Sequence, residues 1–265
     1  MKSSKSLPLF PLSATCLAIL LLLFSPALAA QQAIGQWQSH QSYTVPTYAT
    51  AAGNKIYVVA SNSLFSFDTE DNSLEEYNKV NALNDYSISQ IRYIPETKCL
   101  IIVYRNSNID LMYEDGTVYN LREYADKSLS YNKTINNVST VGPVFYLCTG
   151  FGLVSIDSRT AQFENTYILG QDTYACVEQN GNLYAATADG VYRGDKSTNL
   201  LESGNWEKID NQAFYNAYLF DNTIFFFHSV NGVYRYRPET GSTDRILAGN
   251  YHTSTMGNGQ MIATN

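Results

Sequence analysis

The feature that most constrains the fold of this chain is an internal repeat of about 40 residues. Each copy has an apolar run, then a small or polar residue, then a second apolar and aromatic run. Equivalent positions are Ile56, Leu100, Phe145, Leu183, Ile224 and Met261, at intervals of 44, 45, 38, 41 and 37 residues. This period is typical of β-propeller blades, because one four-stranded sheet cannot cover both of its faces and needs neighbouring sheets to do so.

Each copy divides into four short strands. In the first copy we expect them at 47–52, 55–60, 63–67 and 73–78, and in the fourth at 173–179, 182–187, 190–194 and 204–209. The 21 tyrosines and 12 phenylalanines suit the packed faces of such strands. A sandwich has no reason to repeat at this period, and a β-helix repeats at a shorter one. The pattern therefore predicts an all-β fold, a β-propeller of four-stranded blades, with 121–129 as an inserted loop or helical turn.

The propeller is expected to be incomplete. Five copies are whole, whereas a sixth begins at Gly257 and stops after its second strand. The segment from Ile34 to Tyr43 reads as an extra strand of the kind that closes a ring by joining the last blade. We therefore expect a fragment or a truncated polypeptide, poorly stable alone because an open arc leaves strand edges unpaired.

The N-terminus has the pattern of a secretory signal peptide. Lys2 and Lys5 precede an apolar run from Leu17 to Phe24, and small residues follow at 27–30. That run is too short for a membrane span, which needs roughly 20 apolar residues. We expect a signal peptide at 1–30, an exported partial propeller domain at 31–265, and no transmembrane segment in the mature protein.

The charge balance bears on the choice of partner. Removal of the signal leaves 15 Lys and Arg against 24 Asp and Glu, a net charge of −9. Such an acidic protein is a poor partner for nucleic acid or anionic lipid, which require basic patches. Three cysteines remain, Cys99, Cys148 and Cys176, all in apolar sequence. Their odd number and wide spacing predict buried free thiols; a Cys99–Cys148 bridge is the alternative.

The residues that usually carry catalysis or bind metal are scattered. His40, His228 and His252 have no His, Cys or carboxylate at ligand spacing. Nucleophile-elbow, P-loop and dinucleotide glycine patterns are absent from the sequence. We therefore predict no enzyme, no catalytic residue, no metal and no cofactor, and the sequence alone assigns no binding residue.

Acidic residues recur at one place in the repeat. Asp68, Asp157 and Asp195 each follow the third strand of their copies, where turn formation explains them. The segment 68–73 is also rich in acids, but it lacks the glycine of a calcium loop. We expect a solvated hairpin turn there.

Several short phrases, in a fixed order, resemble one protein family. They are Ile34-Gly35-x-Trp37, Gly53–Tyr57, Ser63–Asp68, Asn78–Asp85, Tyr93–Thr97, Asn106–Leu111, Lys133–Asn136 and Gly150–Val154. Together they resemble the N-terminal propeller of PorZ-like proteins of the type IX secretion system, over roughly residues 34–210.

The resemblance implies a non-enzymatic exported scaffold that supports cargo processing and attachment at the outer membrane. It implies secretion-system partners, a sortase-like peptidase in particular, a surface polysaccharide such as anionic lipopolysaccharide, and a place in the periplasm or at the outer-membrane surface. Full family members continue into a second propeller and a C-terminal secretion signal, which this sequence does not contain. The blades also resemble propeller repeats of hybrid two-component regulators, so a periplasmic glycan- or ligand-sensing domain is the alternative.

Overall fold

The computed structural model describes residues 43–251, 253–257 and 260–264. The expected signal peptide at 1–30, His40, His252 and the expected extra strand apart from Tyr43 lie outside the described residues.

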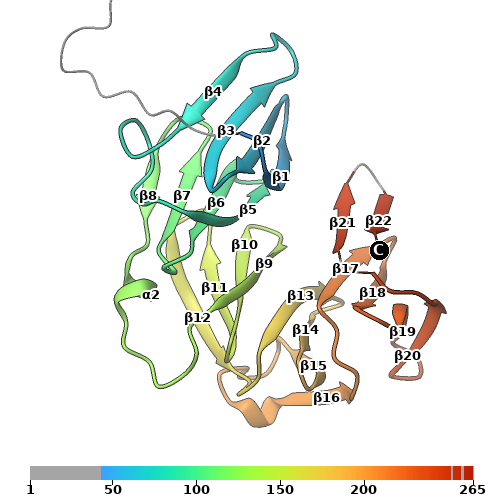
Figure 1. The fold of residues 1–265 in the computed structure, drawn as a ribbon. Coiled ribbons are helices and arrows are strands. Elements are labelled where there is room, and N and C mark those ends of the chain that lie inside the picture. The colour runs from blue at the N-terminus through green and yellow to red at the C-terminus, as the bar shows by residue number, and fades with distance from the viewer. Residues whose placement is uncertain (1–42, 252, 258–259, 265) are drawn as a thin grey trace, which may run out of the picture. The chain divides into compact units, whose positions relative to one another are not determined.

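Antiparallel four-stranded sheets, each joined in chain order, make up most of the described residues (Figure 1). The first sheet holds β1 (Pro46–Ala52), β2 (Lys55–Ala60), β3 (Ser63–Asp68) and β4 (Leu74–Tyr77). The second holds β5 (Ile88–Ile94), β6 (Cys99–Tyr104), β7 (Ile109–Tyr113) and β8 (Val118–Asn120). The third holds β9 (Ile135–Val141), β10 (Val144–Thr149), β11 (Gly152–Asp157) and β12 (Gln162–Ile168).

The later sheets repeat the same order of strands. The fourth holds β13 (Thr173–Gln179), β14 (Asn182–Thr187), β15 (Gly190–Asp195) and β16 (Trp206–Asp210). The fifth holds β17 (Asn216–Phe220), β18 (Thr223–His228), β19 (Gly232–Arg237) and β20 (Ser242–Leu247), and a two-stranded sheet of β21 (Thr253–Gly257) and β22 (Gln260–Thr264) follows. Within the described residues, five four-stranded blades and part of a sixth confirm the predicted incomplete propeller.

Among the residues that the structure describes, helix is confined to short connections. The expected insertion contains the single turn α2 (Glu123–Asp126), and the 3₁₀ turn η1 (Ser203–Asn205) precedes β16. Because η1 occupies 203–205, the fourth strand of that blade begins at Trp206 rather than at the expected 204. The other strands expected for the first and fourth copies agree with the structure to within one residue at each end.

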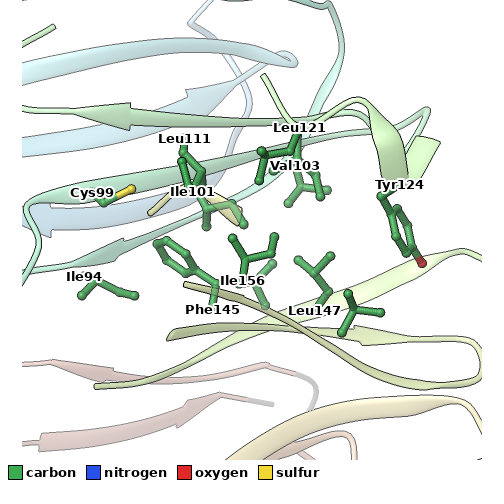
Figure 2. Packing of buried hydrophobic residues seen from close by; sticks show 14 of the residues in the cluster. Ile94, Cys99, Ile101, Val103, Leu111, Leu121, Tyr124, Phe145, Leu147 and Ile156 are labelled. Carbon is green, nitrogen blue, oxygen red and sulfur yellow. The ribbon is translucent and has the colours of Figure 1, made fainter. Parts of the chain in front are cut away.

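Successive blades pack face to face through apolar side chains. Between the second and third blades, Ile101 and Leu111 point toward Phe145, Leu147 and Ile156, all fully buried (Figure 2). Burying such a side chain contributes about 1.5–3 kcal/mol relative to leaving it in water. The first strands of neighbouring blades, β1, β5, β9, β13 and β17, lie beside one another in that order.

A one-residue bulge recurs in the first strand of four blades. Thr47, Ser89, Asn136 and Tyr174 are each the extra residue between consecutive register pairs. Two of these extra residues carry hydroxyls that donate to the second strand of the same blade. Thr47 Oγ1 donates to the carbonyl of Val59, and Ser89 Oγ donates to that of Val103 at 2.9 Å. A bulge reverses the alternation of side chains along the strand, so it decides which residues face the next blade.

The recurring aspartates form turns, as predicted. The Oδ1 atoms of Asp68, Asp157 and Asp195 each accept the backbone N–H two residues later at 2.8 Å. Asp71 does the same for Ser73, so 68–73 is the expected hairpin turn. His228 ends β18, where its Nδ1 accepts the N–H groups of Val230 and Asn231 in the following turn and its ring packs beside Phe214.

The predicted free thiols are confirmed. Cys99, Cys148 and Cys176 are buried and unbridged. Burial raises the pKa of Cys99 and of Cys148 from 9.0 to about 12 and raises that of Cys176 well above 9.0. Since the thiolate is the nucleophile, these groups are unreactive in the folded protein near neutral pH.

Thiol titration with Ellman's reagent at pH 8 is therefore expected to label none of the three cysteines in the folded protein and all of them in urea. The folded state holds these protons more tightly than the unfolded state does. Its stability should be full below about pH 9 and should fall as the pH rises toward 12. Urea unfolding at stepped pH measures this, and a stability that is flat or rising from pH 9 to 11 would contradict it.

Candidate functional site

A cavity of about 640 Å³ runs along the first strands of the third, fourth and fifth blades. Its wall is formed by stretches of β9, β13 and β17 and by Arg92 from β5. Concave sites with a few converging polar groups are the usual ligand sites of proteins. We refer to it as the inner cavity.

Polar side chains of the first strands fasten neighbouring blades beside this cavity. Asn136 donates to the carbonyl of Thr173 at 3.0 Å and Asn137 to that of Tyr174 at 2.9 Å. Ser139 accepts the N–H of Cys176 at 2.9 Å. β13 is an edge strand of its sheet, and these bonds use its backbone groups that do not pair with β14. They hold β9 and β13 together although the two strands belong to different sheets.

Arg92 brings a positive charge to the cavity. Its Nη1 donates to the carbonyl of Ile91 at 3.0 Å, and its Nη2 donates to Oδ1 of Asn137 at 3.3 Å. The guanidinium also lies 5.8 Å from the centre of the Tyr48 ring. Within the described residues, Arg92 forms no ion pair with an acidic side chain.

Amides and an ion pair also line the inner cavity. Gln179 Nε2 donates to the carbonyl of Asn222, which joins the fourth and fifth blades. Among the described residues, the buried Oε1 of Gln179 has no hydrogen-bond partner. Glu178 accepts from the ammonium of Lys196 at 2.6 Å, so its charge is already balanced.

Tyr218 completes the wall. Its hydroxyl donates to the carbonyl of Ser254 at 2.6 Å. Burial raises the pKa of the Tyr218 phenol, while the nearby positive charge of Arg92 acts in the opposite direction. The phenol is therefore a neutral hydrogen-bonding group at ordinary pH.

The described lining of the cavity consists mainly of hydrogen-bonding groups. Among the described residues that line the cavity there is no histidine, the one thiol is the buried Cys176, and the one carboxylate is paired with Lys196. Across the part of the protein that the structure describes, no group of three or more His, Cys, Asp or Glu is arranged to hold a metal ion. A cation surrounded by amides and hydroxyls suits a polar ligand with hydrogen-bond acceptors.

The sequence alone did not identify these residues. A signal was present: Arg92, Asn137 and Ser139 are polar residues placed between apolar residues of the first strands. Without the positions of the bulges, such residues cannot be assigned to the cavity or to a blade face.

A second cluster of polar residues lies inside the second blade. The buried carboxylate of Asp110 accepts from the backbone N–H and the side-chain amide of Asn84, from the Tyr104 hydroxyl at 2.5 Å, and from the Asn120 amide at 2.8 Å. Asp85, the next residue after Asn84, accepts from the amide of Asn108. The sequence phrases 78–85 and 106–111 therefore meet in space and attach the connection between blades to β7.

These repeated four-stranded meanders, packed face to face, define a β-propeller protein. The chain belongs to the PorZ N-terminal β-propeller domain family of the type IX secretion system, whose model matches residues 56–207. A search of curated protein sequences found no match.

Solved structures share the fold. PorZ of Porphyromonas gingivalis, described as an essential bacterial surface component of the type IX secretion system, is similar with a TM-score of 0.70 and 24% identity over 77% of this chain. The extracellular domains of two hybrid two-component systems of B. thetaiotaomicron give TM-scores of 0.61 and 0.60 at 12% and 15% identity, over 84% and 83% of this chain. The alignments span 28% of that PorZ protein and 32% and 30% of the two sensor domains.

Helices long and apolar enough to cross a membrane do not occur among the described residues.

Proposed function

We propose that this protein is a non-enzymatic, exported interaction propeller of the type IX secretion system, supporting the processing and attachment of cargo at the outer membrane. The observation that carries the proposal is the family match over residues 56–207. The similar PorZ structure, described as a surface component of that system, supports the same compartment.

The inner cavity supports a binding role. The described residues of its lining offer a cation, amides and hydroxyls but no activated nucleophile. We propose that its partners are other components of the secretion system, the sortase-like peptidase first among them, with surface polysaccharide as a further ligand. Residues 31–265 would form the propeller domain after cleavage of the signal at 1–30.

A second function has a specific observation in its favour. The similarity to extracellular domains of hybrid two-component systems favours a propeller that senses a glycan or another ligand in the periplasm. Because those identities are low, the likeness supports the fold and leaves the sensing role as the alternative.

Deletion of the gene in its own host distinguishes the two. The secretion proposal predicts that type IX cargo accumulates unprocessed inside the cell, and that an epitope-tagged protein purified from the envelope brings secretion components with it. Mass spectrometry of cell fractions and of the purified material measures both. Normal cargo processing together with altered transcription would contradict the secretion role and favour the sensor.

A further inference from the structure

We propose that the inner cavity binds an extended peptide segment of a partner protein through a carboxylate of that segment, which pairs with Arg92. The inference rests on the proposed interaction function and names the chemistry of its partner. The carboxylate can come from an Asp side group, from a Glu side group or from the carboxyl terminus of the partner, because all three present the same pair of oxygens.

The first argument is the state of the Arg92 charge. The guanidinium is half-buried and donates to one carbonyl and one amide oxygen, both neutral. A guanidinium has five donor N–H groups in a planar fork that matches a carboxylate, and a partly desolvated charge without a counter-charge is unfavourable. An incoming carboxylate would supply that counter-charge.

The second argument comes from the neighbours of Arg92. Asn137 Oδ1 and the face of the Tyr48 ring hold the guanidinium toward the wall of the cavity. The cavity's own carboxylate, Glu178, is held by Lys196 and does not compete for Arg92. The mature protein has a net charge of −9, so most of its surface repels acidic segments of a partner. The unpaired charge of Arg92 therefore directs such segments to the inner cavity.

The third argument concerns the remainder of the ligand. Asn180, Gln179 and Asn222 line the cavity with side chains that both donate and accept, as a peptide backbone does. The buried Oε1 of Gln179 has no partner among the described residues and needs an N–H or O–H donor. A peptide N–H supplies one.

The aromatic residues favour a peptide over a sugar. Sugar rings bind by stacking on an exposed aromatic face. Tyr146 is only 5% exposed, and the ring of Tyr218 packs edge-on to Phe227 with a centroid distance of 5.5 Å. Tyr146 therefore offers no free face and half-buried Tyr218 is partly occupied by Phe227, whereas hydrogen-bonding groups are plentiful.

The test uses the full-length protein, as secreted, and a library of immobilised random peptides of about ten residues with free or amidated C-termini. We expect the selected peptides to share a carboxylate at one position. Fluorescence anisotropy then compares the best peptide with its twin, in which Asn or Gln replaces the acid or the C-terminus is amidated. We expect the neutral twin to bind about tenfold more weakly or worse, and which twin loses affinity identifies the source of the carboxylate.

Three variants assign the effect to the cavity. Arg92→Gln should bind the acidic and neutral twins equally, and Arg92→Lys should keep part of the preference, because it retains the charge without the fork. Arg105→Gln is the matched control: Arg105 also belongs to the second blade but is exposed and bonded to Asn62. It should behave like the unchanged protein, and circular dichroism checks that each variant is folded.

Several outcomes would overturn the inference. These are the absence of any selected peptide, an acid preference that survives Arg92→Gln, and selective binding of a uronic acid glycan in place of peptides. If Arg92→Gln still co-purifies with secretion components as well as the unchanged protein does, the cavity is not the contact, yet the proposed function stands. If peptides bind through Arg92 but no secretion component co-purifies, the peptide site in the cavity stands and the proposed secretion function fails.

Discussion

Gly152→Ala is expected to lower the free energy of unfolding by about 2–6 kcal/mol, the sum of a strained backbone and an overpacked contact. Gly152 begins β11 with φ of 145°, and a Cβ there would lie 2.1 Å from the carbonyl oxygen of Tyr167 and 2.9 Å from the nitrogen of Leu169. Both are backbone atoms of the adjoining strand β12 and its end. Relief of the contact would require the pairing of Gly152 with Ile168 to open.

The matched control is Gly181→Ala. Gly181 also has a positive φ, 76°, but a Cβ there meets nothing within 4 Å. In Gly181→Ala the free energy of unfolding should fall only by the cost of a positive φ in alanine, about 1–2 kcal/mol. Urea unfolding of the two variants measures the difference, and equal losses would show that the close approach is not what requires glycine.

The same geometry recurs at Gly190 and Gly232, where a Cβ would lie 2.0 Å from the Asp210 carbonyl oxygen and 1.8 Å from that of Leu247. The repeat was visible in the sequence because glycine precedes the second apolar run, which forms the third strand, in three copies. The reason for it was not visible, since the residue that meets each glycine lies in the fourth strand, well separated along the sequence. Periodicity reveals that a position is equivalent in each blade, whereas only the packed blade shows which atom lies against it.

The strands and turns could be predicted because their causes are local. Alternating apolar residues fix each strand, and Asn180-Gly181 or Asp68 fixes the adjoining turn through its own backbone preference. The agreement of strand bounds in the first and fourth blades follows from this. No local sequence preference of this kind determines which side chains point into the inner cavity.

The inner cavity could not be predicted because it depends on bulges. The extra residue at Ser89 changes which side of β5 carries Arg92, and the extra residue at Asn136 does the same for Asn137 and Ser139. A strict alternation counted from the strand ends assigns these residues to the wrong faces. The bulges themselves follow from pairing with the second strand, which is a tertiary property.

Asp110→Ala is expected to lower the free energy of unfolding by about 3–5 kcal/mol, because it leaves several buried donors without an acceptor. Asp110 is fully buried, and its carboxylate accepts four hydrogen bonds, two from Asn84 and one each from Tyr104 and Asn120. Water cannot replace it unless the connection at Asn84 moves away from β7. Urea unfolding measures the loss, and amide hydrogen exchange at Asn84 should rise first.

Two further variants separate the network from the simple removal of an acid. Asp115→Ala removes an exposed turn carboxylate that accepts the N–H of Thr117 at 2.8 Å, and it should change stability little. Asp110→Asn keeps the shape but turns one acceptor into a donor facing other donors, so its loss should be clear yet smaller than that of Asp110→Ala. If Asp110→Ala is no worse than Asp115→Ala, the buried carboxylate does not hold the connection between the first two blades. The phrases 78–85 and 106–111 would then need an explanation other than stability, such as contact with a partner.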